Sequence, residues 1–197
     1  MTRAVRVPLD RVGALIGPGG AVKAQLERRA RVRLRIDSET GAVEIIERQT
    51  TNPLKALQAE EVVRAIARGF SPEHAQSLFA DGVFLAVIDV REYTGARVAR
   101  QREMRGRVIG EKGRTRQMIE ELTGCHLAIQ GNTVSAIGEL EGLEVAKRAV
   151  DMLLSGSEHS TVYGFMERKR KEARMTMLDS VDLRSEESAW HVSGEEE

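Results

Sequence analysis

The apolar and polar positions of the chain fall into two similar series of short segments. In the first series, the segments in which apolar and polar residues alternate predict strands at 4–9, 32–37 and 43–46. The segments with apolar residues at helical spacing predict helices at 11–16, 19–30 and from Asn52-Pro53 to Gly69. The predicted order of elements is therefore βααββα.

The second series follows the same order. Strands are predicted at 83–90, 126–130 and 133–137, the last two joined by the turn Gly131-Asn132, a common hairpin signal. Helices are predicted to end at Ile109 and to span 113–123 and 140–154. Gly124 closes the middle helix, at a position that tolerates a left-handed backbone.

A direct repeat connects the two series. When the chain is shifted by 93 residues, 13–36 aligns with 106–129 without a gap, and seven of these 24 positions are identical. The identical pairs are Gly13/Gly106, Ile16/Ile109, Gly17/Gly110, Gly20/Gly113, Glu27/Glu120, Leu34/Leu127 and Ile36/Ile129. The sequence therefore predicts a duplicated α+β module of about 70 residues, a length typical of supersecondary repeats.

The repeat divides the chain into expected parts. These are a first module at 1–70, a linker helix at 71–81, a second module at 82–156, a C-terminal helix at 157–178 and a flexible acidic tail at 179–197. Ser71 and Pro72 form the expected start of the linker helix. The tail carries a net charge of −6, and because the whole chain is neutral the remaining residues carry +6. The chain is thus a basic body with an acidic end.

Each module contains a glycine-flanked loop directly before a helix, at Gly17–Gly20 and Gly110–Gly113. Glycine lets another backbone approach closely, and the free N–H groups of a helix N-terminus favour phosphate. A P-loop is excluded because no Lys-Ser/Thr pair follows, and a dinucleotide fingerprint is excluded because the third glycine is missing. The remaining alternatives are a plain tight turn and a loop that holds a nucleic-acid backbone.

The order βααββα with I-G-x-x-G resembles the type I KH domain, so that two tandem KH domains packed together are expected. In that family the G-x-x-G loop clamps the backbone of single-stranded nucleic acid. The chain also resembles a more specific group, the archaeal Dim-two / partner-of-Nob-one (Krr-one-related) rRNA-processing proteins. That resemblance rests on "RGRVIGEKGRTRQMIEELTG", on "RGFSPEHAQSLF" and on the segment from Gly131 to Glu172.

The resemblance implies a role and partners. The role is small-subunit ribosome biogenesis, in which the protein binds the 3′ region of the small-subunit rRNA and positions processing partners. The implied partners are single-stranded RNA, the alpha subunit of translation initiation factor two and the Nob-one endonuclease. A generic KH regulator of other RNAs and a protein-binding scaffold with vestigial loops stay open as alternatives.

The same resemblance implies a set of RNA-binding residues in the second module. They are Arg107, Ile109, Gly110, Glu111, Lys112, Gly113, Arg114 and Arg116. The segment 97–116 has eight basic residues against two acidic ones, so the second loop should be the stronger clamp. The first loop lacks a basic insert and is a second candidate site, for RNA or for protein, made of Ile16, Gly17, Pro18, Gly19, Gly20 and Lys23.

Other classes of function are not expected. The four histidines and Cys125 have no metal-ligand spacing, and no nucleophile motif occurs, so neither an enzyme nor a metal or cofactor site is predicted. A single cysteine points to a buried structural thiol in a reducing, cytoplasmic setting. Neither a transmembrane run nor an N-terminal signal sequence is evident.

Overall fold

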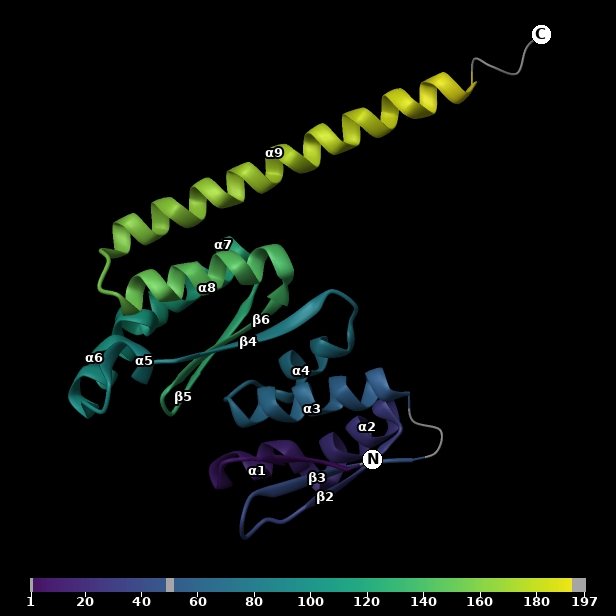
Figure 1. Cartoon of the computed structure of the whole chain (residues 1–197), viewed down its shortest axis with the longest axis vertical. Helices are drawn as coiled ribbons and strands as arrows, with labels where there is room; N and C mark the ends of the chain where they lie inside the picture. Colours follow the sequence, from purple (N-terminus) through teal and green to yellow (C-terminus); the bar gives the residue numbers. More distant parts are fainter. Residues whose placement is uncertain (1, 49–51, 193–197) are drawn as a thin grey trace.

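The computed structural model describes residues 2–48 and 52–192, with side chains up to 176. The elements form a stack of layers (Figure 1). A first sheet, from residues 2–47, is covered by the helices at 9–16, 21–30 and 53–67. The linker at 72–79 and a second sheet, from residues 83–139, lie on the other side of the helix at 53–67, and the helices at 114–123, 140–154 and 159–192 follow above the second sheet. This arrangement confirms the predicted α+β class and the two βααββα modules.

The first module closely follows its apolar pattern. Its strands are β1 (Thr2–Arg6), β2 (Val32–Ile36) and β3 (Ala42–Glu47), arranged in the antiparallel order β1-β3-β2. Its helices are α1 (Leu9–Ile16), the short 3₁₀ turn η1 (Pro18–Gly20), α2 (Ala21–Ala30) and α3 (Pro53–Ala67). The side chain of Asn52 caps α3 by accepting a hydrogen bond from the Leu54 N–H, as the Asn-Pro pair predicts.

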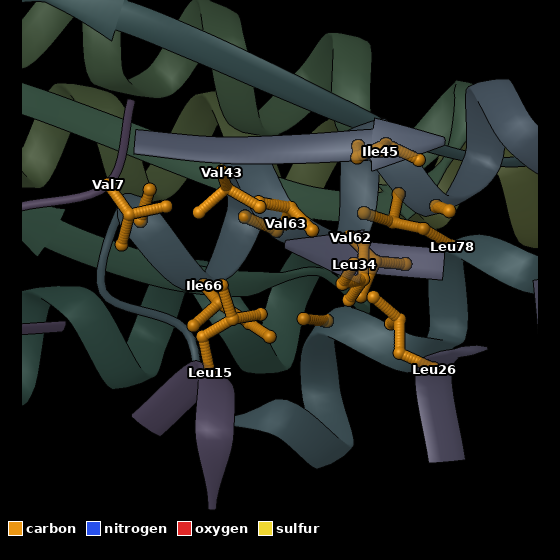
Figure 2. Close-up of a cluster of buried hydrophobic side chains, with 14 of the residues drawn as sticks. Val7, Leu15, Leu26, Leu34, Val43, Ile45, Val62, Val63, Ile66 and Leu78 are labelled. Carbon is orange, nitrogen blue, oxygen red and sulfur yellow. The ribbon is translucent and has the colours of Figure 1, made fainter. Parts of the chain in front are cut away.

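The core of this module lies between the sheet and its helices. Leu15, Leu26 and Ile66 point from the helices toward Leu34 and Ile45 of the sheet (Figure 2). All five are fully buried, and burial of such side chains stabilises the fold by about 1.5–3 kcal/mol each.

The linker helix belongs to this first core rather than standing between two independent bodies. It comprises α4 (Pro72–Ala75) and the 3₁₀ turn η2 (Gln76–Phe79), and Ser71 caps it by accepting from the His74 N–H. Leu78 and Phe79 are buried in the same cluster as Leu15 and Leu26. The linker therefore extends the apolar surface that the first module offers to the second.

The second module repeats the topology with additions. Its strands β4 (Val83–Asp89), β5 (His126–Gln130) and β6 (Thr133–Glu139) pair in the antiparallel order β4-β6-β5. Its helices are α5 (Arg91–Thr94), α6 (Val98–Ile109), α7 (Arg114–Thr123) and α8 (Leu140–Leu154), with the 3₁₀ turn η3 (Glu111–Gly113) before α7. Helix α5 has no counterpart in the prediction, and it is tied to α8 by the Tyr93 hydroxyl, which donates to Asp151 at 2.9 Å. Burial and that carboxylate raise the pKa of Tyr93 to about 12.

One of the repeated identities, Glu27/Glu120, has a direct structural cause. The carboxylate of Glu27 accepts a hydrogen bond from the Leu34 N–H, and the carboxylate of Glu120 accepts one from the Leu127 N–H, both at 2.7 Å. Each bond fastens the helix after the glycine loop to the next strand. An identical glutamate is kept in both modules because it performs the same local task.

The two modules pack against each other through the open face of the second sheet. Ala128 and Ile137 of that sheet lie in the core cluster of the first module. The Gln130 amide donates to the Asp10 carboxylate at 2.9 Å, and the rings of His74 and His126 stack with centroids 3.9 Å apart.

This histidine stack makes the joint sensitive to acid. Burial first, and then neighbouring His74, lowers the pKa of His126, while Glu120 acts in the opposite direction and Arg116 in the same one. The unfolded chain therefore binds the proton more readily, so stability present above pH 6.5 should fall as the pH drops below that value. Urea unfolding at about pH 7.5 and at about pH 5.5, on either side of the ordinary histidine pKa, measures the loss in the free energy of unfolding. His126→Phe keeps a stacking ring and should flatten this dependence; an unchanged slope in that variant would contradict the assignment.

The C-terminal helix is longer than predicted. Helix α9 spans His159–Val192, well past the predicted end at 178, and takes up most of the segment 179–197 for which flexibility is predicted. The physical reason is that 159–192 contains no proline and only one glycine, Gly164, so nothing in the sequence breaks the helix. Val162 and Met166 anchor its first turns in the second core, and its far end extends beyond the body (Figure 1). Residues 193–197 lie outside the described residues.

Candidate nucleic-acid interface

The two glycine loops have the same backbone geometry. Gly17 and Gly110 have φ values of 71° and 74°, and Gly20 and Gly113 have φ values of 79° and 81°. Between them, Gly19 and Lys112 occupy the same left-handed region, with φ of 56° and 50°. Lys112 is one of only two non-glycine residues at positive φ in the described part of the chain, so this backbone shape is kept despite its cost.

The two glycines of the second loop are needed for different reasons. A Cβ on Gly110 would lie 2.2 Å from the Thr115 hydroxyl, so this glycine lets the loop close on its own helix. A Cβ on Gly113 would meet nothing within 4 Å, so the space above it is open to a ligand. Helix α7 begins directly behind, at Arg114, and no side chain caps its N-terminus. The N–H groups of Gly113 and Arg114 donate within the turn, to the carbonyls of Gly110 and Glu111, so the loop attracts an anion through its open surface and the positive end of the α7 dipole.

The eight basic side chains of 97–116 separate into two groups. Five have no side-chain partner among the described residues and project from the surface: Arg97, Arg100, Arg102, Lys112 and Arg114. The other three are engaged. Arg116 pairs with Glu120 at 3.4 Å, and Arg105 donates to the Gly131 carbonyl in the β5–β6 turn.

Arg107, the third engaged residue, has a structural task. Its guanidinium donates to the carbonyls of Leu153 at 3.2 Å and Ser157 at 2.5 Å, at the end of α8. Arg11 does the same in the first module, with the carbonyls of Ile66 at 3.0 Å and Phe70 at 2.6 Å at the end of α3. Each arginine adds a charged donor at a helix C-terminus, where the carbonyls of Leu153 and Ile66 also accept the N–H groups of Gly156 and Gly69. An RNA contact by Arg107 stays a prediction, and three of its five N–H groups remain for one.

A stripe along α6 continues from the loop, and of its residues only Ile109 was part of the predicted site. Val98, Arg102, Arg105 and Ile109 are spaced by four, three and four residues, so they share one side of the helix. The bond from Arg105 to Gly131 places that side toward the β5–β6 turn. Val98 is 73% exposed and Ile109 is 38% exposed, although both are apolar. The spacing of these four residues is visible in the sequence, but only the structure shows that this side of α6 is turned away from the core.

On the other side of the loop, α9 supports it from behind. The hydroxyls of Thr115 and Tyr163 lie 3.0 Å apart, and the His159 ring is 3.0 Å from the Arg107 carbonyl at the end of α6. These residues line a hollow of about 470 Å³ beside Gly110. In the first module Val22 stands where Thr115 stands in the second, so the linker helix beside it finds no matching hydroxyl.

This support yields a prediction. Thr115→Val should lower the free energy of unfolding by about 0.5–1.5 kcal/mol, because one buried hydrogen bond is lost without a change of volume. Thermal unfolding measures it, and Tyr163→Phe should give a similar loss, with little further effect when the two changes are combined. Val22→Thr, at the matching position of α2, has no tyrosine to bond and places a hydroxyl against the first core, so it should lower stability rather than raise it. Additive losses for Thr115→Val and Tyr163→Phe would show that the two hydroxyls act separately.

The first loop offers less charge than the second. Pro18 and Gly19 are exposed and neutral, Ile16 is half-buried against the core, and Lys23 is half-buried on α2. Arg11, the one basic residue of α1, is held by the end of α3. Because α1 begins only at Leu9, this module also lacks the extended stripe that α6 provides.

The described residues also bear on the predictions for metal binding, for the single thiol and for membrane spans. No group of three His, Cys, Asp or Glu side chains in residues 2–48 and 52–176 could hold a metal ion. Cys125 is buried, as predicted, and burial raises the pKa of its thiol. None of the described helices combines the length and the apolar character needed to cross a membrane.

Comparison with known proteins agrees with this geometry. The KH domain family matches residues 2–61, and the eukaryotic type KH domain (KH domain type I), in its form for the second domain of Pno1, matches residues 84–171. The KH domain-containing protein MJ0443 of Methanocaldococcus jannaschii is 43% identical over 176 residues, which are 89% of this chain and 77% of that protein. The crystal structure of an a/eIF2alpha-aDim2p-rRNA complex from Pyrococcus horikoshii matches with a TM-score of 0.82 and 41% identity, over 87% of this chain and 95% of that one. The chain belongs to the Dim2/Pno1 family of two-KH-domain proteins.

A eukaryotic member of the Dim2/Pno1 family is more distant. The pre-rRNA-processing protein pno1 of Aspergillus fumigatus is 28% identical over 169 residues, which are 83% of this chain and 66% of that protein. The family resemblance predicted from the second module is therefore confirmed, and in this chain the second G-x-x-G loop has more unpaired cations around it than the first.

Proposed function

We propose that this Dim2/Pno1-family protein binds single-stranded RNA in the 3′ region of the small-subunit rRNA during ribosome biogenesis. The observation that supports the proposal is the second loop itself. Open space above Gly113 coincides with two unpartnered cations, Lys112 and Arg114, at the uncapped start of α7. Cationic side chains beside the positive end of a helix dipole favour the binding of RNA phosphates.

The proposed path of the RNA runs from the loop along α6. Phosphates contact Lys112 and Arg114, while bases lie against the exposed apolar side chains of Ile109 and Val98. Arg102 lies between these two on the same side of the helix, where its planar guanidinium can stack on a base or bind a phosphate. The short Gly131-Asn132 turn, tied to Arg105, forms the opposite border.

The choice of RNA and of partners is supported by the relatives. One is named as a pre-rRNA-processing protein and another was crystallised with a/eIF2alpha and rRNA. We propose the same classes of partner here, the initiation-factor subunit and the Nob-one endonuclease, acting in the cytoplasm. The first module, whose loop has no unpaired arginine beside it, is the better candidate for protein contact. This role requires binding and positioning, and it involves no catalytic step by the chain itself.

Crosslinking and sequencing of RNA bound to the intact protein in its native cells tests the proposal. Reads concentrated at the 3′ end of the small-subunit rRNA, with crosslinked peptides from 97–116, are the expected result. Reads scattered over many transcripts would instead indicate a generic KH regulator. Near absence of crosslinked RNA would indicate a protein scaffold that has kept the fold without its ligand.

A further inference from the structure

The outer strand of the second sheet combines apolar sequence with exposure. Strand β4 carries six consecutive apolar residues, from Val83 to Ile88, yet none of its side chains is fully buried. Phe84 is 49% exposed and Val87 is 39% exposed. Leu140, which is also exposed, begins α8 just two residues after Gly138, the residue paired with Phe84. Because side chains alternate along a strand, Phe84 and Val87 lie on opposite faces of β4, so both faces expose apolar surface beside this edge, as an interaction surface does.

The backbone of this strand is free on its outer side. Strand β4 pairs only with β6, along all seven residues. In an antiparallel pair every second residue directs its N–H and C=O away from its partner. Among the described residues no backbone or side-chain group bonds to those outward-facing positions of 83–89.

The other three sheet edges are protected, which sets β4 apart. The edge strands of the first sheet carry charged side chains, Arg3 and Arg6 on β1 and Arg33 and Arg35 on β2. Strand β5 is flanked by the first module through its contacts with Asp10 and His74. Charge and coverage are the usual means by which proteins prevent edge pairing, and β4 has neither between 83 and 88.

We propose that β4 pairs with β4 of a second copy of this chain, antiparallel about a two-fold axis, to form a continuous six-stranded sheet. A two-fold interface brings the same residues together from both sides. With Ala86 opposite itself, Phe84 faces Ile88 and Leu85 faces Val87, so only apolar side chains meet along the centre. At each end of the pairing Val83 faces Asp89, whose carboxylate is already neutralised by Arg91 of its own chain. Apolar side chains are thus complementary along the centre of this register.

The proposed dimer leaves RNA binding unobstructed. Strands β4 and β5 are opposite edges of one sheet, and the α6 stripe faces the turn between β5 and β6. The two surfaces can therefore be occupied together, and the inference does not depend on the proposed function.

Analytical ultracentrifugation of the intact protein over low to high micromolar concentration tests this inference. The expected result is a monomer–dimer equilibrium that Val87→Lys shifts at least about tenfold toward monomer, since two buried charges would meet uncharged backbone and apolar neighbours. Leu9→Lys is the matched control, because Leu9 is 59% exposed on α1, and it should leave the equilibrium unchanged. A wild-type protein that is monomeric at every concentration overturns the inference. So does a dimer that persists in Val87→Lys, or a dimer that dissociates equally in Val87→Lys and in Leu9→Lys.

Thiol crosslinking tests the register independently. Residues directly opposite in an antiparallel pair have Cα atoms about 4.5–5.5 Å apart, within the range of a disulfide. Ala86→Cys should therefore form a covalent dimer on oxidation, whereas Phe84→Cys should not, and buried Cys125 provides no competing thiol. Crosslinking by Phe84→Cys in place of Ala86→Cys would overturn the proposed pairing.

Discussion

A protein with Glu111→Asp and Lys112→Asp should bind single-stranded RNA from the 3′ end of the small-subunit rRNA at least about tenfold more weakly, because phosphate contacts supply much of nucleic-acid affinity. The change replaces the one cation at the tip of the loop with a carboxylate. Stability should be unchanged, since both side chains are exposed and aspartate tolerates the left-handed backbone of position 112. Fluorescence anisotropy with a labelled oligonucleotide measures the affinity, and its salt dependence should become shallower in the variant.

The first loop provides the control. Pro18→Asp with Gly19→Asp introduces two negative charges on the same backbone shape, where no unpaired arginine stands beside the loop. We expect a smaller loss of affinity there. Equal losses from the two loops would mean that both modules hold RNA, and unchanged affinity in the second-loop variant would refute the assignment of the clamp.

The second large effect concerns stability. Arg107→Met should lower the free energy of unfolding by about 1–3 kcal/mol, because the carbonyls of Leu153 and Ser157 lose a charged donor at the end of α8. Methionine keeps much of the side-chain length, so that the loss reports the hydrogen bonds more than the packing. Urea denaturation of the intact protein measures it.

Arg102→Met is the matched comparison on the same helix. Arg102 is exposed and has no partner among the described residues, so its removal should leave stability within about 0.5 kcal/mol of the wild type, as for most surface substitutions. It should nevertheless weaken RNA binding. If Arg107→Met lowers RNA affinity strongly with no loss of stability, the structural role assigned to Arg107 is wrong.

The pair Arg102 and Arg107 shows what the sequence could and could not predict. The repeat, the βααββα order and the two loops follow from local spacing, and the bounds of β5 and α8 match their predictions. The task of an individual arginine does not follow, because it depends on which carbonyls or which open surface a distant part of the chain places beside it. Arg107 enters the predicted site by its position next to the loop, whereas Arg102 and Val98 are found only once the exposed side of α6 is known.

Long-range contacts explain the other differences. Helix α5 is held by the hydrogen bond between Tyr93 and Asp151, which are 58 residues apart. No local sequence pattern predicts this contact. The support of the loop by Tyr163 likewise joins residues 48 apart. The length of α9 could have been predicted, since nothing between 159 and 192 interrupts a helix, but the acidic composition of its end favours the opposite interpretation.

The burial of the second sheet against the linker has a consequence for how the two halves of the chain can exist. Ala128 and Ile137 are covered by a core that the first module and residues 70–79 build. The second module on its own would expose this face to water, so it should be poorly soluble when produced without residues 1–81. Duplication therefore did not leave two autonomous units in this chain. The first module now forms part of the core of the second. Deletion of the first module should therefore abolish RNA binding by the second, although every residue of the second loop is retained.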